Sequence, residues 1–273
     1  MKSIIKQKEF SIFMIVVLLC VVLSFVSPVF LTFENFLDII EGNVVMAILA
    51  VGMTLVIITG DIDVSVAAAT TAVAVIIGNL FSFLPDSWIS ILILFLIAPV
   101  IGIIIGAING LLVSKIKIPA IVVTLGTLNI INGLVLYLTN GQYLNSSNFP
   151  KPFLTFANFE FLGIPILVYL LTAVAILTWF ILKHTLIGRS VLAIGGKSQS
   201  AVRVGINYNK VKLFVFAYMG FLAGIAAIAQ TAYTKAVDPN GLLGVEMMVI
   251  AAVVLGGTNI QGGRGSIQGT LLG

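Results

Sequence analysis

The sequence predicts an all-α polytopic integral membrane protein with about eight spanning helices and the start of a ninth. Of its 273 residues, 60% are hydrophobic and only 9% are charged, and the mean hydropathy is +1.20. Soluble domains carry roughly 25% charged residues. A chain so poor in charge lacks the polar groups to cover a water-facing surface, so we expect lipid to surround much of it.

The apolar runs are long enough to cross a bilayer, which takes about 20 mostly apolar residues. Two of them are short, and polar or glycine-rich residues interrupt the pattern near 60–65 and 256–266. Short, interrupted runs are typical of broken helices along a transport path, although a thin helix with an interfacial loop would give the same pattern. The runs are 10–31, 44–59, 64–84, 88–113, 118–138, 161–182, 213–233 and 242–256, with a ninth opening at Ser266.

The first run follows Lys2, Lys6 and Lys8, as in a signal peptide. Its apolar stretch is too long for one, and no small-residue cleavage site follows, so we expect an uncleaved first helix. The single cysteine, Cys20, excludes an internal disulfide framework. With one histidine, His184, and no hydrolase or metalloprotease motif, the sequence predicts no enzyme activity, no metal site and no cofactor in this chain.

Basic residues predict the orientation. If the N-terminus is cytoplasmic and each run crosses once, twelve of the 14 basic residues lie inside, and only Lys151 and Lys235 lie outside. Inner loops carry the excess of lysine and arginine in membrane proteins. The basic residues flank helices and form no aromatic-interleaved patch, so nucleic acid is not an expected partner.

Glycines recur at a spacing of four in two runs: Gly102, Gly106 and Gly110 in one, Gly220 and Gly224 in another. This spacing places a groove along one helix face, where a second backbone can approach closely. The pattern predicts a compact helical bundle.

Two polar regions would be costly in lipid, and they supply the candidate residues of a substrate path. The first contains Asp61, Asp63 and Ser65, between the second and third runs. Asp63 or Ser65 could simply cap the next helix, or the acids could serve gating or solute passage. The second consists of uncharged polar side chains within apolar runs, which would either bond between helices or line a path for a neutral polyhydroxylated solute: Asn109, Thr124, Thr127 and Asn129.

The segment 183–212 is the largest predicted cytoplasmic element, and it carries six basic residues and no acid. Ser198 is a plausible N-cap of a short helix over 198–204, and Gly205 a plausible residue just past its end. Such a helix is a natural docking element, although a basic loop that only fixes topology remains an alternative. Gly195 and Gly196 before Lys197 imitate a phosphate-binding loop, but Val191 stands where that motif needs glycine.

Four stretches in order resemble the membrane permeases of the ribose-type family of ABC importers. Residues 52–66, GMTLVIITGDIDVSV, resemble the family signature GMTLVILTGGIDLSVG, and 117–128 resemble its IPAFIATLGT stretch. The segment 188–206 resembles the family's main cytoplasmic loop, and 251–266 resembles its AAVVLGGTSLxGGRGS run. The segments 149–165 and 251–266 also resemble permeases for autoinducer-2, a furanose-like signalling molecule.

The chain departs from the family pattern at three places. Asp61 replaces the second glycine of the signature, and Ala67 stands where the signature ends in glycine. Family members continue for one or two further helices, whereas this chain stops at Gly273 within an apolar segment. The expectation is therefore one transmembrane permease domain over 1–273 that lacks the family's C-terminal helices.

The resemblance implies a permease subunit that transports a monosaccharide or a similar small solute across the bacterial inner membrane. It implies an extracytoplasmic binding protein, a second permease copy or paralogue, and cytoplasmic ATPase subunits that use ATP. These ATPases would engage 183–212 as the coupling element, for which the candidate residues are Gly195, Gly196, Ser198, Ala201, Arg203 and Gly205. An ion-coupled secondary sugar transporter that uses Asp61 and Asp63 remains the alternative.

Overall fold

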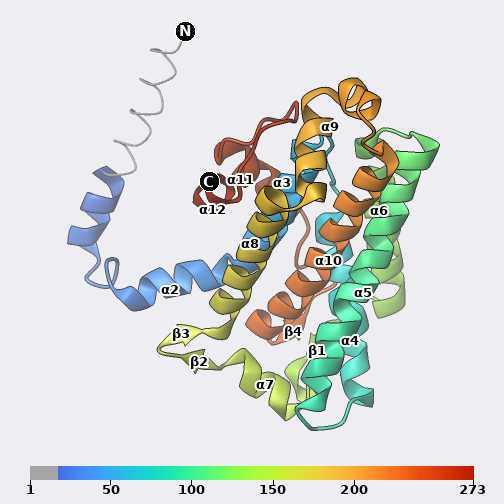
Figure 1. Cartoon of the computed structure of the whole chain (residues 1–273). Coiled ribbons are helices and arrows are strands. Elements are labelled where there is room, and N and C mark those ends of the chain that lie inside the picture. Colours follow the sequence, from blue (N-terminus) through green and yellow to red (C-terminus); the bar gives the residue numbers. More distant parts are fainter. Residues whose placement is uncertain (1–17) are drawn as a thin grey trace. The chain divides into compact units, whose positions relative to one another are not determined.

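The computed structural model describes residues 18–273, and helices make up most of them (Figure 1). Of these residues, 18–42 belong to one compact unit and 43–273 form another. The first unit contains helical residues 18–26 and α2 (Phe33–Gly42). The helices of the second unit are α3 (Val44–Ile58), α4 (Val66–Leu80), α5 (Ile89–Leu111), α6 (Ala120–Thr139), α7 (Lys151–Ala157), α8 (Ile166–His184), α9 (Leu186–Arg203), α10 (Tyr208–Thr234), α11 (Val245–Leu255) and α12 (Ile267–Leu272).

The predicted all-α polytopic class is confirmed, whereas the predicted number of spans is not. Five helical segments within the described residues are long and apolar enough to cross a membrane: Val66–Phe83, Ile89–Ile116, Ala120–Thr139, Ile166–His184 and Tyr208–Thr234. A sixth is counted if α2 and α3 together make one span, and α11 is shorter at 11 residues. Part of the predicted first span, residues 10–17, lies outside the described residues.

The predicted run 161–182 begins too early. A hairpin of β2 (Glu160–Phe161) and β3 (Ile164–Pro165) occupies its first residues, with Gly163 at a φ of +71° between the strands. The helix α8 therefore begins only at Ile166. A second two-stranded pair joins β1 (Leu144–Asn145) to β4 (Ala236–Val237), and so ties the segment after α6 to the end of α10.

The glycine pattern has the packing role that the sequence predicts, and the two glycine stripes face each other. A Cβ on Gly102 would lie 2.0 Å from the carbonyl oxygen of Gly220, and a Cβ on Gly106 would lie 2.1 Å from that of Phe216. A Cβ on Gly224 would lie 2.4 Å from the carbonyl oxygen of Ala98. No side chain fits between these backbones, which is why α5 and α10 can lie directly against each other (Figure 1).

The helix α3 is the most completely enclosed apolar helix of residues 43–273. It packs against α8, α10, α11 and α12, and residues 48–58 along it are all buried. Its C-terminal end therefore lies inside protein, where its last carbonyl groups need partners other than water. The break that follows, residues 59–65, is where these partners gather.

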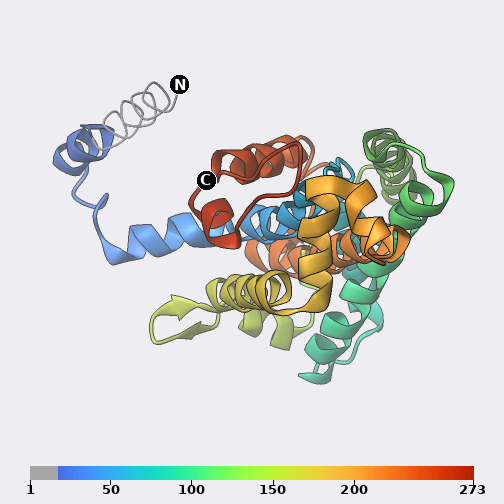
Figure 2. The ribbon, with the colours of Figure 1, turned by 45° about the horizontal axis from the view of Figure 1, so that its top comes forward.

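The segment 183–212 is more helical than predicted. The sequence indicates a loop with a short helix over 198–204, but α9 begins at Leu186 and runs to Arg203, with non-helical backbone at Lys197. The kink at Lys197 divides α9 into a longer first part and a short second part. Figures 1 and 2 show α9 at the end of the bundle where α8 ends and α10 begins.

Candidate substrate path and coupling site

One chain of hydrogen bonds joins the two polar regions that the sequence singles out. Asp63 Oδ1 accepts from the backbone nitrogen of Ser65 at 2.9 Å and from Ser65 Oγ at 2.6 Å. Ser65 Oγ in turn accepts from Asn109 Nδ2 at 2.9 Å, and Asn109 Oδ1 accepts from Thr127 Oγ1 at 2.6 Å. This Asp63–Ser65–Asn109–Thr127 network links the break after α3 to α5 and α6.

Burial explains why these side chains bond to one another. Asp63 is 3% exposed, and Ser65 and Asn109 are fully buried. Polar groups out of contact with water are costly unless they are hydrogen-bonded. The pKa of Asp63, which lies between the helical spans, is raised to about 6 because burial disfavours its charged form more than the bonds from Ser65 favour it.

The other predicted path residues differ in their placement. Thr124 lies beside the network, where its Oγ1 donates to the carbonyl oxygen of Ala120 at 2.9 Å and approaches that of Ile62 at 3.4 Å. Asn129 lies outside it: its side chain is exposed on α6 and donates to the carbonyl oxygen of Leu125. Gly126 and Gly133 share that face of α6, and a Cβ on either would meet nothing within 4 Å.

Asp61 has a different partner from Asp63, although only Ile62 lies between them. Its Oδ2 accepts from Lys212 Nζ at 2.5 Å, and the same ammonium donates to Thr59 O at 2.9 Å and to Thr59 Oγ1 at 3.3 Å. Burial raises the pKa of Asp61, and the charge of Lys212 opposes that rise. The lysine and aspartate side chains are 2% and 14% exposed.

Lys212 is a functional candidate that sequence reasoning missed. Its place beside Lys210, where an apolar run begins, is typical of a lysine that only marks the cytoplasmic side. Its partners lie more than 150 positions earlier in the chain. The acid at position 61, just after the apolar run 44–59, was the available signal, because a buried acid requires a cation or a donor nearby.

The predicted coupling residues take several roles along α9. Gly195 lies against the end of α3, where a Cβ would come 1.7 Å from the carbonyl oxygen of Ile58, whereas a Cβ on Gly196 would meet nothing within 4 Å. Ser198 and Arg203 are exposed on the short second part of α9, and Ala201 between them is buried. This short part thus packs through Ala201 and presents a free outer surface.

Gly205 ends α9 as the sequence predicts. Its φ is +91°, a left-handed conformation that favours glycine. Its nitrogen donates to the carbonyl oxygen of Val202, and the nitrogen of Ile206 donates to that of Ala201. These two bonds form a Schellman motif, which fixes the direction in which the chain leaves α9 for α10.

A polar pocket of about 400 Å³ lies between the kink of α9 and the break after α3. Residues from four regions line it, and the Lys212–Asp61 pair forms part of its wall: Thr59, Gly60, Asp61, Ile194, Gly195, Gly196, Lys197, Ser198, Gln199, Tyr208, Lys212 and Gln261. Residues of the predicted coupling element and of the predicted path region thus line the same pocket.

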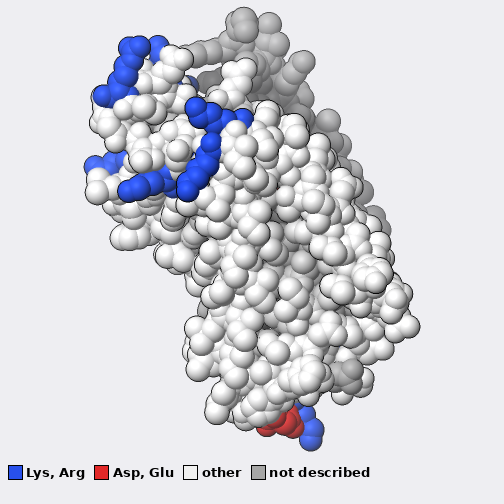
Figure 3. All heavy atoms as spheres, turned by 90° about the vertical axis from the view of Figure 1, so that its right-hand side faces the viewer, with Lys and Arg blue, Asp and Glu red and all other residues white. Residues whose placement is uncertain are grey.

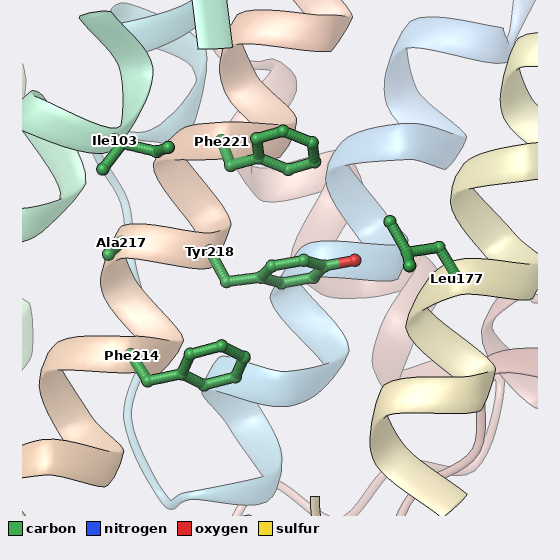
Figure 4. A pocket seen from close by; sticks show the side chains of 6 residues that line it. All are labelled: Ile103, Leu177, Phe214, Ala217, Tyr218 and Phe221. Atoms are coloured by element: carbon green, nitrogen blue, oxygen red, sulfur yellow. The ribbon is translucent and has the colours of Figure 1, made fainter. Parts of the chain in front are cut away.

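An apolar pocket of about 310 Å³ lies elsewhere, between α5, α8 and α10 (Figure 4). Phe214, Tyr218 and Phe221 stack along α10, with ring centroids 5.7 and 5.8 Å apart. The Tyr218 hydroxyl and Thr178 Oγ1 are 2.7 Å apart and share a hydrogen bond. Because that hydroxyl is already engaged, this pocket suits apolar contact better than the binding of a polar solute.

Charge is segregated on the face of the molecule that Figure 3 shows. Lysine and arginine atoms gather there at the end that carries α9, while aspartate and glutamate atoms lie at the opposite end beside further basic atoms. This matches the uneven distribution of basic residues in the sequence.

The comparisons with known proteins identify the family. Residues 35–273 match the family described as branched-chain amino acid transport system / permease component. The chain belongs to this permease family. The permease is 35% identical to the ribose import permease protein RbsC of Haemophilus influenzae over 278 residues, which cover 100% of this chain and 83% of the relative.

Two further relatives show the breadth of the similarity. The ribose import permease protein RbsC of Escherichia coli K12 is 35% identical, over 98% of this chain and 82% of its own. The autoinducer 2 import system permease protein LsrC of Klebsiella pneumoniae is 34% identical, over 100% of this chain and 78% of its own. No solved structure matches the chain. The predicted family is confirmed, and the chain is a multi-pass membrane permease with several apolar helices.

Proposed function

We propose that the chain is the permease subunit of an ATP-driven importer for a monosaccharide or a similar small polyhydroxylated solute. The similarity to ribose and autoinducer 2 import permeases over nearly the whole chain carries this proposal. ATP hydrolysis belongs to a separate ATPase subunit, and this chain contributes a path that changes between two conformations.

The chemistry of the buried network supports such a solute. Asn109, Thr127 and Ser65 offer donors and acceptors without net charge, which suits the hydroxyl groups of a sugar. In the structure these groups form hydrogen bonds with one another. A solute that binds to them would therefore replace these bonds with bonds to its own hydroxyl groups. Asn129, exposed on an apolar helix, needs a polar neighbour in the membrane, and the path or a second permease copy would supply it.

The surface of α9 supports docking of a cytoplasmic ATPase. Val202 and Val204 are 50% and 79% exposed at the end of the short second part of α9, next to the exposed Arg203. An apolar contact flanked by basic charge, in a segment without acids, favours a partner surface with an apolar groove and acidic residues. A binding protein on the opposite side would deliver the solute.

The decisive experiment measures what drives uptake. The vesicles should contain the permease, its co-purified ATPase and a solute-loaded binding protein. ATP enclosed in these vesicles should drive accumulation of labelled solute without an ion gradient. Ribose, other pentoses and autoinducer 2 should be compared as competitors. Accumulation that survives ATP depletion but collapses with an ionophore would refute the importer and support the ion-coupled alternative through Asp61 and Asp63.

We further propose that the end of the molecule with α9 faces the cytoplasm of a bacterial inner membrane, with the N-terminus on the same side. The segregation of basic residues supports this orientation. In a Cys20→Ala background, cysteines at Asn145 and Gln199, both exposed, report the two sides. An impermeant thiol reagent added to intact cells should label position 145 and leave 199 unlabelled, and the reverse pattern would contradict the orientation.

A further inference from the structure

The ammonium group of Lys212 holds the end of one helix to the start of another. Lys212 lies in the second turn of α10, and its side chain is 2% exposed. It donates to Thr59, the residue that caps the C-terminus of α3, and to Asp61 in the break that follows. A cation at the carbonyl end of a helix also faces the negative end of the helix dipole. This side chain is therefore a fixed link between α10 and the end of α3.

The first part of α9 holds the same end of α3 one residue earlier. Gly195 lies so close to the carbonyl oxygen of Ile58 that a Cβ there would come within 1.7 Å of it. The same oxygen accepts from the nitrogen of Gly263 at 2.8 Å. A contact between backbones contains no flexible side chain that could absorb a shift, so a displacement of α9 acts directly on the end of α3.

The two contacts come from one continuous stretch of chain. Only residues 204–207 separate α9 from α10, and Gly205 and Asn207 fix the chain direction there through the Schellman motif and through the bond from Lys210 N to Asn207 Oδ1. A partner that moves the short second part of α9 therefore moves both contacts. Between them lies the polar pocket of about 400 Å³, which leaves space beside the kink at Lys197.

The far side of the break belongs to the substrate path. Four positions after Thr59, Asp63 begins the network through Ser65 and Asn109 to Thr127. The segment 59–65 thus has Lys212 at one end and the network at the other. A shift of Thr59 and Asp61 changes the position of Asp63, because few residues separate them.

We infer that Lys212 is a positioning residue through which movement of α9 reaches the break between α3 and α4. This inference rests on the proposed function, because it assigns a route between the docked ATPase and the path. Energetic coupling between two sites is reciprocal. The same link therefore carries the signal of a docked, solute-loaded binding protein back to the ATPase.

The test measures the stimulation ratio, which is ATP hydrolysis with solute-loaded binding protein divided by hydrolysis without it. Lys212→Met removes the ammonium group and keeps an unbranched apolar stem. Coupling between two sites typically changes the affinity at one of them by roughly 5–150-fold. We expect Lys212→Met to lower the stimulation ratio and solute uptake by about tenfold. Co-purification with the ATPase and the basal hydrolysis rate should stay unchanged. Lys115→Met, at an exposed lysine outside α9 and α10, is the matched control and should retain the wild-type ratio.

A double variant separates coupling from charge balance. Lys212→Met leaves Asp61 without its cation, which lowers stability. Asp61→Gly/Lys212→Met removes both charges, so the thermal midpoint should return toward the wild-type value. The stimulation ratio should stay low, because the link to Thr59 is still missing. If the stimulation ratio of the double variant recovers together with its thermal midpoint, Lys212 only balances the charge of Asp61. That result would overturn the inference.

The controls also separate this inference from the proposed function. If the wild-type complex shows no ATP-dependent uptake, the proposed function fails and the inference falls with it. If the wild-type complex is stimulated and takes up solute while Lys212→Met does both equally well, only the inference is refuted.

Discussion

The break between α3 and α4 and the break between α11 and α12 interrupt short apolar helices in different ways. In residues 59–65, side chains that come from other helices satisfy the polar groups: Lys212 bonds to Thr59 and Asp61, and Asn109 bonds to Ser65. In residues 256–266, backbone atoms form most of the hydrogen bonds that satisfy the polar groups. Asn259 N donates to Arg264 O, Gly262 N donates to Asn259 O, and Gly263 N reaches the end of α3.

Glycine geometry makes the second break possible. Gly257, Gly262 and Gly263 all have φ between +79° and +89°, which side chains rarely allow. A Cβ on Gly256 would lie 2.3 Å from the carbonyl oxygen of Gly269 on α12. The first break can therefore change by exchanging side-chain partners, whereas the second is a tightly packed support. The four variants below test that difference, in order of decreasing expected effect.

The largest effect is expected where the two breaks meet at α9. Gly195→Ala places a Cβ 1.7 Å from Ile58 O and 2.6 Å from Gly263 N, both backbone atoms that cannot turn aside. We expect a loss of about 3 kcal/mol in stability, at the upper end of overpacking costs, and a clear fall of the thermal midpoint in detergent. Gly196→Ala is the neighbouring control, with nothing within 4 Å. Equal midpoints for the two variants would contradict this packing.

The next effect tests the side-chain network of the first break. Ser65→Ala removes the hydroxyl that donates to Asp63 Oδ1 and accepts from Asn109 Nδ2. Leaving buried partners unsatisfied costs about 1–3 kcal/mol, and solute uptake should fall with it. Ser82→Ala is a suitable control, because the Ser82 hydroxyl bonds only to a carbonyl three residues away at an exposed position. A Ser65→Ala midpoint as high as that of Ser82→Ala would show that the network adds no stability.

A smaller effect, with a distinct pH signature, is expected at Asp63. Asparagine can also accept from Ser65 N and Oγ, so Asp63→Asn should cost less than about 1 kcal/mol and keep substantial uptake. Because burial raises the pKa of Asp63 to about 6 from 3.8, the unfolded chain loses this proton at lower pH than the folded chain. The contribution of Asp63 to stability is therefore full below pH 3.8 and is lost as the pH rises through about 6.

Thermal midpoints of wild type and Asp63→Asn between pH 4 and pH 7 measure this contribution. The wild type should lose stability relative to the variant as the pH rises across this range. A constant difference would contradict the pKa shift of Asp63. Abolished uptake in a folded Asp63→Asn protein would instead point to ion coupling.

The sequence located both breaks and all four residues of the network, because a polar side chain in an apolar run is costly wherever it lies. It placed Asp63 and Ser65 in one group and Asn109 and Thr127 in another, since the bonds between the groups depend on how α4, α5 and α6 are aligned. The glycine spacing of α5 and α10 predicted a close backbone approach but not that the two stripes face each other. Lys212 went unrecognised for a related reason: its burial depends on the position of α3, which the local sequence does not contain.

The smallest effect is expected at Thr258, a buried polar side chain of the second break whose hydroxyl has no partner among the described residues. Thr258 is 3% exposed, and no atom of the described residues bonds to its Oγ1. Valine has nearly the same shape without the hydroxyl, so Thr258→Val should leave the thermal midpoint unchanged or raise it. The matching gain in the free energy of unfolding should be at most about 1 kcal/mol. Uptake should also be retained if the second break is a support that does not exchange partners during transport. A loss as large as that of Ser65→Ala would mean that Thr258 Oγ1 finds a partner in another conformation, and that both breaks change during the transport cycle.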